Sequence, residues 1–243
     1  DLLPPRREAW MAKALKRARR AAGAARDLDV LVDHFAALAS SQRGMRTDPV
    51  SKQLRMRRAA VQESIMACRE WFQAQEFAQR VKGLLERIRL RKKVDRLTNP
   101  SYLAAGRRAL FVLAYDFFAA GETELASLEA LHAFRITGKQ LRYAIEIYAG
   151  AFARPLRHEF YPLLEELQDR LGAINDLSVQ RDYWMKWLGS STEEEMTQAL
   201  RWTTERSQQD LAEARRAFVE WWQPQRLADM SRQLHSMIGV PCG

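Results

Sequence analysis

Four side chains that can bind an anion recur at helical spacing in the stretch LHAFRITGKQLRYAIEIY, residues 131–148. Positions i, i+3, i+7 and i+10 fall on one face of a helix that turns about 100° per residue. Here these positions hold His132, Arg135, Lys139 and Arg142. Arginine forks and lysine ammonium groups both bind phosphate oxygens. The spacing therefore predicts a basic stripe that can hold a phosphate-rich anion.

An apolar stripe accompanies the basic one on the same predicted helix, formed by Leu131, Phe134, Leu141, Ile145 and Tyr148. The cations therefore flank a packed seam. A solvated helix face commonly pairs acidic and basic residues four positions apart, whereas this stripe meets only one carboxylate, Glu146. The excess of positive charge favours an external anion. The competing interpretation is a solvated face whose aliphatic stems cover apolar neighbours.

His132 has two open interpretations. It can be a core histidine that is hydrogen-bonded to a neighbouring helix, or it can contact phosphate directly. We favour the first, because a single neutral imidazole adds little to a cationic groove. His132 nevertheless remains within the candidate site.

A second basic face is predicted near the N-terminus at i, i+3, i+4 and i+7, where the residues are Lys13, Lys16, Arg17 and Arg20. Glu8 is the only acid that offsets them. Both ligand contact and simple solvation remain open for this face. Arg26 is a further candidate, for which phosphate contact competes with an ion pair to Asp27, to Asp29 or to a carboxylate of the other half.

Composition narrows the class of protein and of partner. The chain has 243 residues, 47% of them hydrophobic, enough to bury a core. Its 39 Lys and Arg against 30 Asp and Glu give a formal charge of +9, which attracts nucleic acid, anionic membranes or polyphosphate. No apolar run approaches the roughly 18 residues that span a bilayer, and the first residues do not resemble a signal sequence. Cys68 and Cys242 match no metal or redox spacing. We expect a cytoplasmic protein with no membrane partner.

Long segments of 3.6-residue periodicity, separated by most of the glycines and prolines, predict an all-α fold. Some neighbouring segments are expected to be continuous. The predicted helices span residues 5–22, 25–40, 50–70, 74–93, 100–120, 123–151, 157–172, 175–188, 192–221 and 224–238.

Two segments of the chain resemble each other. AGAARDLDV at 22–30 and LGAINDLSV at 171–179 are identical at five of nine positions, an offset of 149 residues. This similarity indicates a duplication, with a first helical half at 1–121 and a second at 122–243 within a single domain, 1–243. The same offset places the counterpart of the His132 helix before residue 1. We therefore expect the opening helix of the first half to be missing from the chain.

Three ordered motifs resemble the CHAD family, the conserved-histidine α-helical domain. LHAFRITGKQLRYAIE at 131–146 is similar to the family pattern LHxLRIxxKRLRYxxE, and LLEELQDRLGAIND at 163–176 is similar to LxxLQxxLGxLND. AGAARDLDV at 22–30 is similar to the first-half pattern LGxxRDLDV. The resemblance implies two helical bundles related by a pseudo-twofold axis, a basic central surface, and binding of inorganic polyphosphate without catalysis.

The chain departs from the family pattern in two places. The first-half helix VHxxRVxxRRLR is absent, so half of the implied basic face is missing or is supplied by other residues. In the second half, Gly138 and Gln140 stand where small and basic residues are usual, and a glycine inside a helix destabilises it by up to about 1 kcal/mol. Gly23 and Gly172 are interpreted as close helix contacts.

Our favoured hypothesis is a non-catalytic module that holds inorganic polyphosphate, or other polyanions, in a basic groove between the two halves. Such a module would bring the protein to cytoplasmic polyphosphate granules. It needs no cofactor, metal or catalytic residue. The oligomeric state stays open. The candidate ligands are His132, Arg135, Lys139, Arg142, Arg26, Lys13, Lys16, Arg17 and Arg20.

Three alternatives are kept. A nucleic-acid-binding protein fits the charge equally well, although no helix-turn-helix, RNP or zinc-finger pattern is present. A phosphorelay on His132 is disfavoured because Ile136 stands where such sites usually have glycine. A metal-dependent phosphohydrolase needs clustered histidines and carboxylates, but the four histidines are scattered along the chain.

Overall fold

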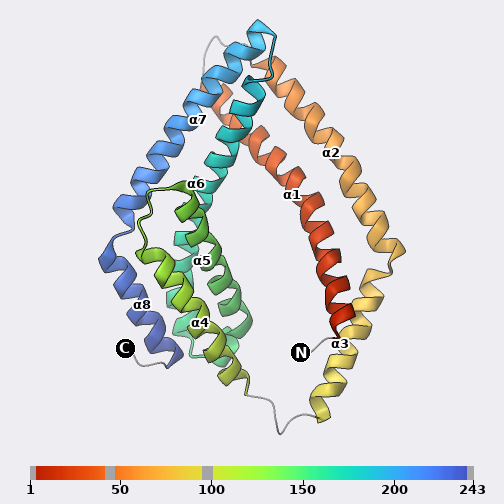
Figure 1. Cartoon of the computed structure of the whole chain (residues 1–243), viewed down its shortest axis with the longest axis vertical. Helices are drawn as coiled ribbons and strands as arrows, with labels where there is room; N and C mark the ends of the chain where they lie inside the picture. The colour runs from red at the N-terminus through yellow and green to blue at the C-terminus, as the bar shows by residue number, and fades with distance from the viewer. Residues whose placement is uncertain (1–3, 42–46, 95–100, 240–243) are drawn as a thin grey trace. The chain divides into compact units, whose positions relative to one another are not determined.

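The computed structural model describes residues 4–41, 47–94 and 101–239, and all regular structure within these ranges is helical (Figure 1). The α-helices are α1 (Pro5–Ser41), α2 (Asp48–Ala74), α3 (Phe77–Val94), α4 (Tyr102–Glu122), α5 (Leu128–Tyr148), α6 (Tyr161–Leu188), α7 (Glu194–Trp221) and α8 (Pro224–Ile238). A 3₁₀ turn, η1 (Ala149–Ala151), and a π-helical turn, η2 (Leu156–Phe160), lie between α5 and α6. The predicted all-α fold is confirmed.

Two pairs of predicted helices are continuous, namely 5–22 with 25–40 and 157–172 with 175–188. Gly23 and Gly172 lie close to the expected breaks, yet both are inside helices. A methyl group added at either glycine would meet no atom within 4 Å. Our expectation that these two glycines make close helix contacts is therefore wrong.

The helix that carries the predicted basic stripe, α5, has a defined start. The Ser127 side chain accepts a hydrogen bond from the backbone nitrogen of Ala130 at 3.0 Å, and Glu129 lies in the first turn. A serine cap satisfies one of the unpaired amides at a helix start, and an acid there complements the helix dipole. The preceding helix, α4, is capped in the same way by Ser101, which accepts from Ala104 at 3.1 Å. These caps define where α4 and α5 begin.

The chain divides into two compact units. The first comprises residues 1–99 and 187–203, and the second comprises residues 100–186 and 204–243. These units do not coincide with the expected halves at 1–121 and 122–243. The difference arises because α4 packs against α5 and α8 in the second unit, whereas the turn between α6 and α7 belongs to the first.

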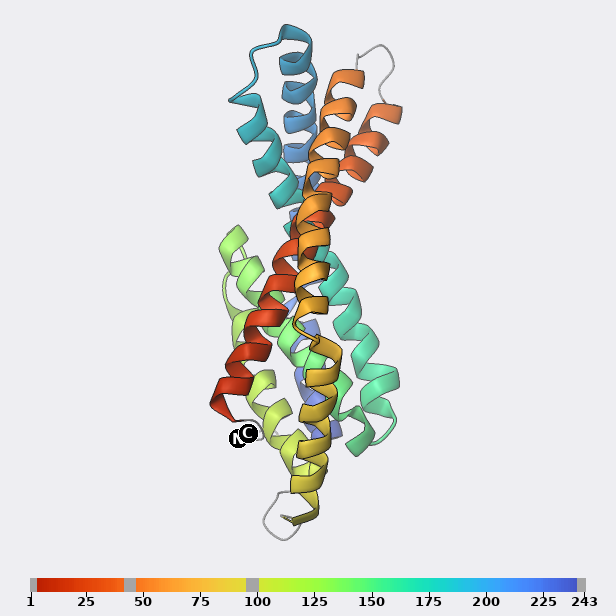
Figure 2. The same cartoon turned by 90° about the vertical axis from the view of Figure 1, so that its right-hand side faces the viewer.

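The second unit is built around an aromatic and aliphatic core. Helices α4 and α5 run side by side in it (Figures 1 and 2), and Phe117 of α4 stacks on Phe134 of α5 with ring centroids 5.1 Å apart. Trp222 lies 5.1 Å from Phe134 on another side, and its Nε1 donates to the Gly121 carbonyl at 3.2 Å. Burying one such aromatic side chain stabilises the fold by about 1.5–3 kcal/mol. The apolar stripe predicted on α5 is this core face: Leu131, Phe134, Leu141 and Ile145 are buried, and Tyr148 is half-buried.

The first unit is held by the pairing of α1 with α2. Phe35, Leu31 and Leu54 form its buried seam. Two cations of the RMRR cluster at 55–58 also hold this unit together. Arg58 pairs with Asp29 of α1 at 2.6 Å, and the Arg57 guanidinium lies over the Trp187 ring at 4.0 Å.

Candidate anion-binding site

The stripe on α5 lies along the edge of the buried seam of the second unit. His132 is exposed, whereas Arg135, Lys139 and Arg142 are half-buried. Because a helix rises about 1.5 Å per residue, the ten steps from His132 to Arg142 give a stripe about 15 Å long. All three cations are therefore only partly accessible to solvent, and part of each side chain packs against the protein.

Arg135 is the least neutralised arginine of the stripe. Its Nε is buried and has no hydrogen-bond partner, and no described residue forms an ion pair with its guanidinium. A buried donor without a partner destabilises the fold by about 1–3 kcal/mol. An oxygen-rich anion held by the accessible part of the guanidinium would offset the charge that the protein leaves unmatched.

Arg142, at the other end of the stripe, is partly neutralised. Its Nη1 lies 3.7 Å from Glu146 Oε1, and its guanidinium lies 5.0 Å from the Tyr143 ring centroid. Tyr161 donates a hydrogen bond to Glu146 at 2.6 Å, so this carboxylate is shared. Partial burial alone lowers the pKa of Arg142, but the hydrogen bond with Tyr143 and the charges of Tyr161 and Glu146 raise the net pKa. Arg142 is thus a permanent cation whose charge is only partly free for a ligand.

His132 joins α5 to α6. Its Nδ1 lies 3.0 Å from Asn175 Oδ1, and Asn175 Nδ2 donates to Asp176 at 3.3 Å. Since the amide oxygen only accepts, Nδ1 carries the hydrogen, and Nε2 of the neutral ring is then an acceptor. The predicted hydrogen bond across helices is present, but His132 is exposed and is not a core residue. A neutral His132 cannot donate Nε2–H to phosphate, so only its protonated form can serve as a ligand.

A cavity of about 530 Å³ lies beside His132, between α5 and α6. Its wall includes Glu129, Asp182 and Arg181, and Arg181 pairs with Asp182 at 2.6 Å. Two carboxylates and a neutralised arginine make this cavity a poor phosphate site. Anion binding is better suited to the open stripe than to this cavity.

The candidates on α1 form a separate group. Lys13, Lys16, Arg17, Arg20 and Arg26 are all exposed, and they belong to the first unit, whereas the stripe belongs to the second. Arg17 lies over the Trp71 ring of α2 at 5.0 Å. Asp29 is paired with Arg58, and Arg26 has no ion pair within the described ranges. The ion pair considered for Arg26 with Asp27 or Asp29 is therefore not formed.

The sequence model of the CHAD domain matches residues 1–185. This chain belongs to the CHAD family. The crystal structure of the CHAD domain from the plant Ricinus communis shares its fold, with a TM-score of 0.63 and 18% sequence identity over 97% of this chain and 73% of that chain. A comparison with curated proteins finds no match. The predicted family membership is thus confirmed.

The CHAD motifs meet where α5 contacts α6. Asn175, the partner of His132, is the asparagine of the LGAIND motif, and the motif alone does not indicate this contact. Gly138 was interpreted only as a weak point of the helix. A methyl group there would overlap the amide nitrogen of Gln168 on α6 and lie 3.4 Å from Phe117. Gly138 therefore leaves room for the side chain of Gln168.

Two further observations concern the described part of this CHAD chain. None of its helices combines the length and the apolar character that crossing a bilayer requires. No three histidine, cysteine or acidic side chains in the ranges 4–41, 47–94 and 101–239 are grouped so that they could hold a metal ion.

Proposed function

We propose that this CHAD domain binds inorganic polyphosphate along the α5 stripe as a binding module without chemical turnover. The observation that carries the proposal is Arg135, a half-buried arginine with an unpartnered Nε and no ion pair among the described residues. At the other end of the stripe, Arg142 pairs with Glu146 at 3.7 Å.

The shape of the stripe suits a linear polyanion. Arg135, Lys139 and Arg142 follow one another along one face of α5. Each internal unit of polyphosphate carries about one negative charge with exposed oxygens, which match arginine forks and the lysine point charge. Such recognition reads charge and spacing rather than a base sequence. Binding would place the protein, or a domain joined to it, on cytoplasmic polyphosphate granules.

Nucleic acid is the second candidate ligand, and one observation favours it. Tyr143 is 47% exposed and lies beside Arg142 on α5, so a base could stack on its ring next to a cation. Single-stranded nucleic acid offers the same phosphate charge as polyphosphate. The two ligands must therefore be compared directly.

A competition titration at near-physiological salt tests the proposal. Long-chain polyphosphate and single-stranded RNA should each be used to displace the other as the labelled ligand, at equal concentration of charge. We expect polyphosphate to displace RNA efficiently and RNA to displace polyphosphate poorly. Equal competition would mean that the domain is a non-selective polyanion binder.

The same samples should be assayed for released phosphate. We expect none above the rate without protein. Steady release that depends on the protein would contradict a binding module and would indicate phosphohydrolase activity.

A further inference from the structure

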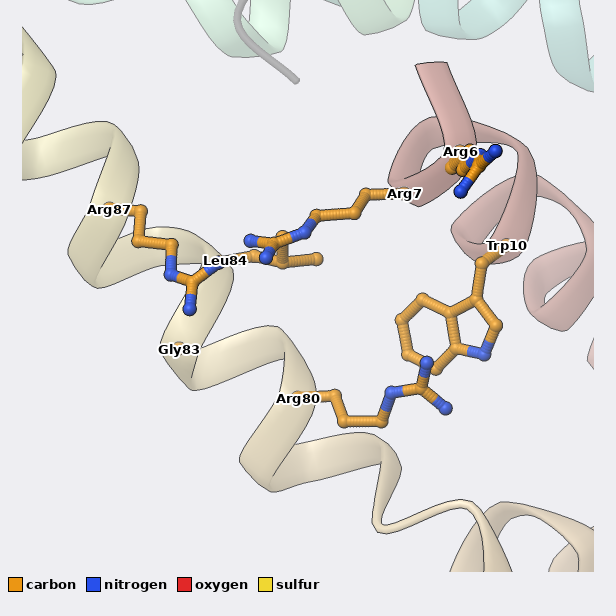
Figure 3. A pocket seen from close by; sticks show the side chains of 7 residues that line it. All are labelled: Arg6, Arg7, Trp10, Arg80, Gly83, Leu84 and Arg87. Carbon is orange, nitrogen blue, oxygen red and sulfur yellow. The ribbon is translucent and has the colours of Figure 1, made fainter. Parts of the chain in front are cut away.

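A basic pocket in the first unit is drawn in Figure 3, and none of its described lining residues is among the candidates considered so far. It has a volume of about 390 Å³, which is within the range of small-molecule sites. Two helices supply its wall, α1 through its first two turns and α3 through its middle. The residues that line it are Arg6, Arg7, Trp10, Arg80, Gly83, Leu84 and Arg87.

The described residues of this pocket carry charge of one sign. Four of the described lining residues are arginines, and none of them is a carboxylate. The Arg7 side chain extends from α1 toward α3, and the Arg87 side chain extends from α3 toward Arg7 (Figure 3). The side chains of Arg6 and Arg87 form no hydrogen bond or ion pair with other described residues. Guanidinium groups gathered without a counter-charge repel one another, so an anion between them would stabilise the arrangement.

One arginine of the pocket has a structural role that fixes its wall. The Arg80 guanidinium lies 4.1 Å from the Trp10 ring centroid, and its Nη1 donates to Gln75 at 3.2 Å. Trp10 also packs on Phe77, with ring centroids 5.4 Å apart. Leu84, which also lines the pocket, is buried. This wall is therefore held by packing, which leaves the other three arginines to meet a ligand.

The position of Arg6 and Arg7 strengthens the case for an anion. Both lie in the first turn of α1, where the helix dipole is positive and disfavours cations. Neither arginine therefore stabilises the helix through its dipole. A negatively charged group bound beside this turn would interact favourably with the dipole and with both side chains.

We propose that this pocket binds a compact oligophosphate group, such as a diphosphate or triphosphate, independently of the α5 stripe. Several arginine forks that converge from two helices suit adjacent phosphates, since each fork can chelate two oxygens. A pocket walled on two sides selects a short, compact group, whereas an open stripe suits a long chain. Free tripolyphosphate and a nucleoside triphosphate share the required chemistry.

Calorimetric titration with inorganic tripolyphosphate tests this site. The Arg7→Ala, Arg87→Ala double variant should bind tripolyphosphate at least about tenfold more weakly than the native chain, because two charge-assisted contacts are lost. The matched control is Arg55→Ala, Arg69→Ala, which removes the same charge from exposed positions of α2 outside the pocket. The control should stay within about threefold of the native affinity, as expected for distant exposed charges.

Two additions keep the result interpretable. Circular dichroism should show unchanged helicity in every variant, and Arg7→Lys, Arg87→Lys should lose affinity only partly, because lysine keeps the charge but not the fork. A parallel titration with ATP distinguishes a nucleoside triphosphate from an inorganic oligophosphate as the ligand of the pocket. Tighter binding of ATP that Trp10→Ala weakens selectively would identify a nucleotide, and equal or weaker binding of ATP would identify an inorganic chain or chain end.

The proposal is overturned if tripolyphosphate fails to bind saturably, or if the folded Arg7→Ala, Arg87→Ala variant binds it as tightly as the control. Arg135→Ala separates this inference from the α5 proposal. That variant should retain tripolyphosphate binding to the pocket. If it also retains long-chain binding, the α5 proposal fails while the pocket stands.

Discussion

Helices α1 and α6 occupy the same place in the internal repeat. Some positions that are buried on α6 are nevertheless exposed on α1. Leu164 of α6 is fully buried, whereas its counterpart 149 residues earlier, Leu15 of α1, is 55% exposed. Leu171 is 1% exposed, and its counterpart Ala22 is exposed. At these two positions of the repeat, the side chain is therefore buried in the second unit and exposed in the first.

The cause is the helix that covers α6. Gln168 and Asn175 are the α6 residues that meet Gly138 and His132 of α5. Their counterparts on α1 by the same offset are Arg19 and Arg26, and both are exposed. Where a partner helix is present, these positions hold neutral amides. Where none of the described residues covers them, they hold cations.

The comparison is tested most strongly by a matched pair of truncations. Leu164→Ala should lower the free energy of unfolding by about 2–5 kcal/mol, because it leaves a cavity in a closed core. Leu15→Ala should lower it by only about 0.5 kcal/mol, as for an ordinary surface change. Urea unfolding followed by circular dichroism measures both. Equal losses would show that the exposed face of α1 is covered in solution.

The contact between α5 and α6 can be tested by adding one methyl group. Gly138→Ala should destabilise the protein by about 1–2 kcal/mol, since the buried Gln168 amide must move. Gly172→Ala should instead stabilise it by up to about 1 kcal/mol, because its methyl group meets no atom within 4 Å and alanine favours the helix.

Thermal melts of Gly138→Ala and Gly172→Ala show directly whether each substitution stabilises or destabilises the protein. The double variant Gly138→Ala, Gln168→Ala should recover part of the loss if the amide is the obstacle. A stabilising effect of Gly138→Ala alone would mean that α5 and α6 are farther apart than the structure shows.

A pH dependence should distinguish the start of α6 from that of α1. Burial, followed by the hydrogen bond to Glu146, raises the pKa of Tyr161 above its ordinary value of about 10. As the pH rises, the tyrosine of the unfolded chain therefore loses its proton before Tyr161 of the folded chain does. The contribution of Tyr161 to the free energy of unfolding is complete below about pH 10, and it is lost as the pH rises through the higher pKa of the folded state. The counterpart on α1 is Ala12, which cannot titrate.

Urea unfolding between pH 9 and 11 checks this effect. Tyr161→Phe should show a smaller decline in the free energy of unfolding with pH than the native chain. Identical pH slopes would rule out a contribution from Tyr161. We expect this to be the smallest of the three effects on stability.

Helical periodicity was sufficient to predict the buried face of α5, because Leu131, Phe134, Leu141 and Ile145 all lie on one side of an ideal helix. It could not predict the exposure of Leu15, since Leu15 and Leu164 share their place in the repeat. Burial depends on which helix lies opposite, and a pattern within one helix does not contain that information. Periodicity also left open which neighbouring segments are continuous, and α1 runs through Gly23 without a break.

The candidate site was predictable in part. Residue type and spacing placed His132, Arg135, Lys139 and Arg142 on one face of α5, and the structure has them there. The bond from His132 to Asn175 joins residues 43 positions apart, and neither helix alone indicates it. The basic pocket was missed because its arginines come from two helices whose separate patterns are unremarkable.

The most direct test of the central claim is a titration of long-chain polyphosphate into Arg135→Ala and Arg20→Ala, one arginine from each basic face. Arg135→Ala should weaken binding about tenfold and lower the slope of log affinity against log salt concentration by about one ion. Arg20→Ala should weaken binding by no more than about threefold, since its exposed side chain is free to move. If folded Arg135→Ala binds polyphosphate as tightly as the native chain, the α5 stripe is not the site.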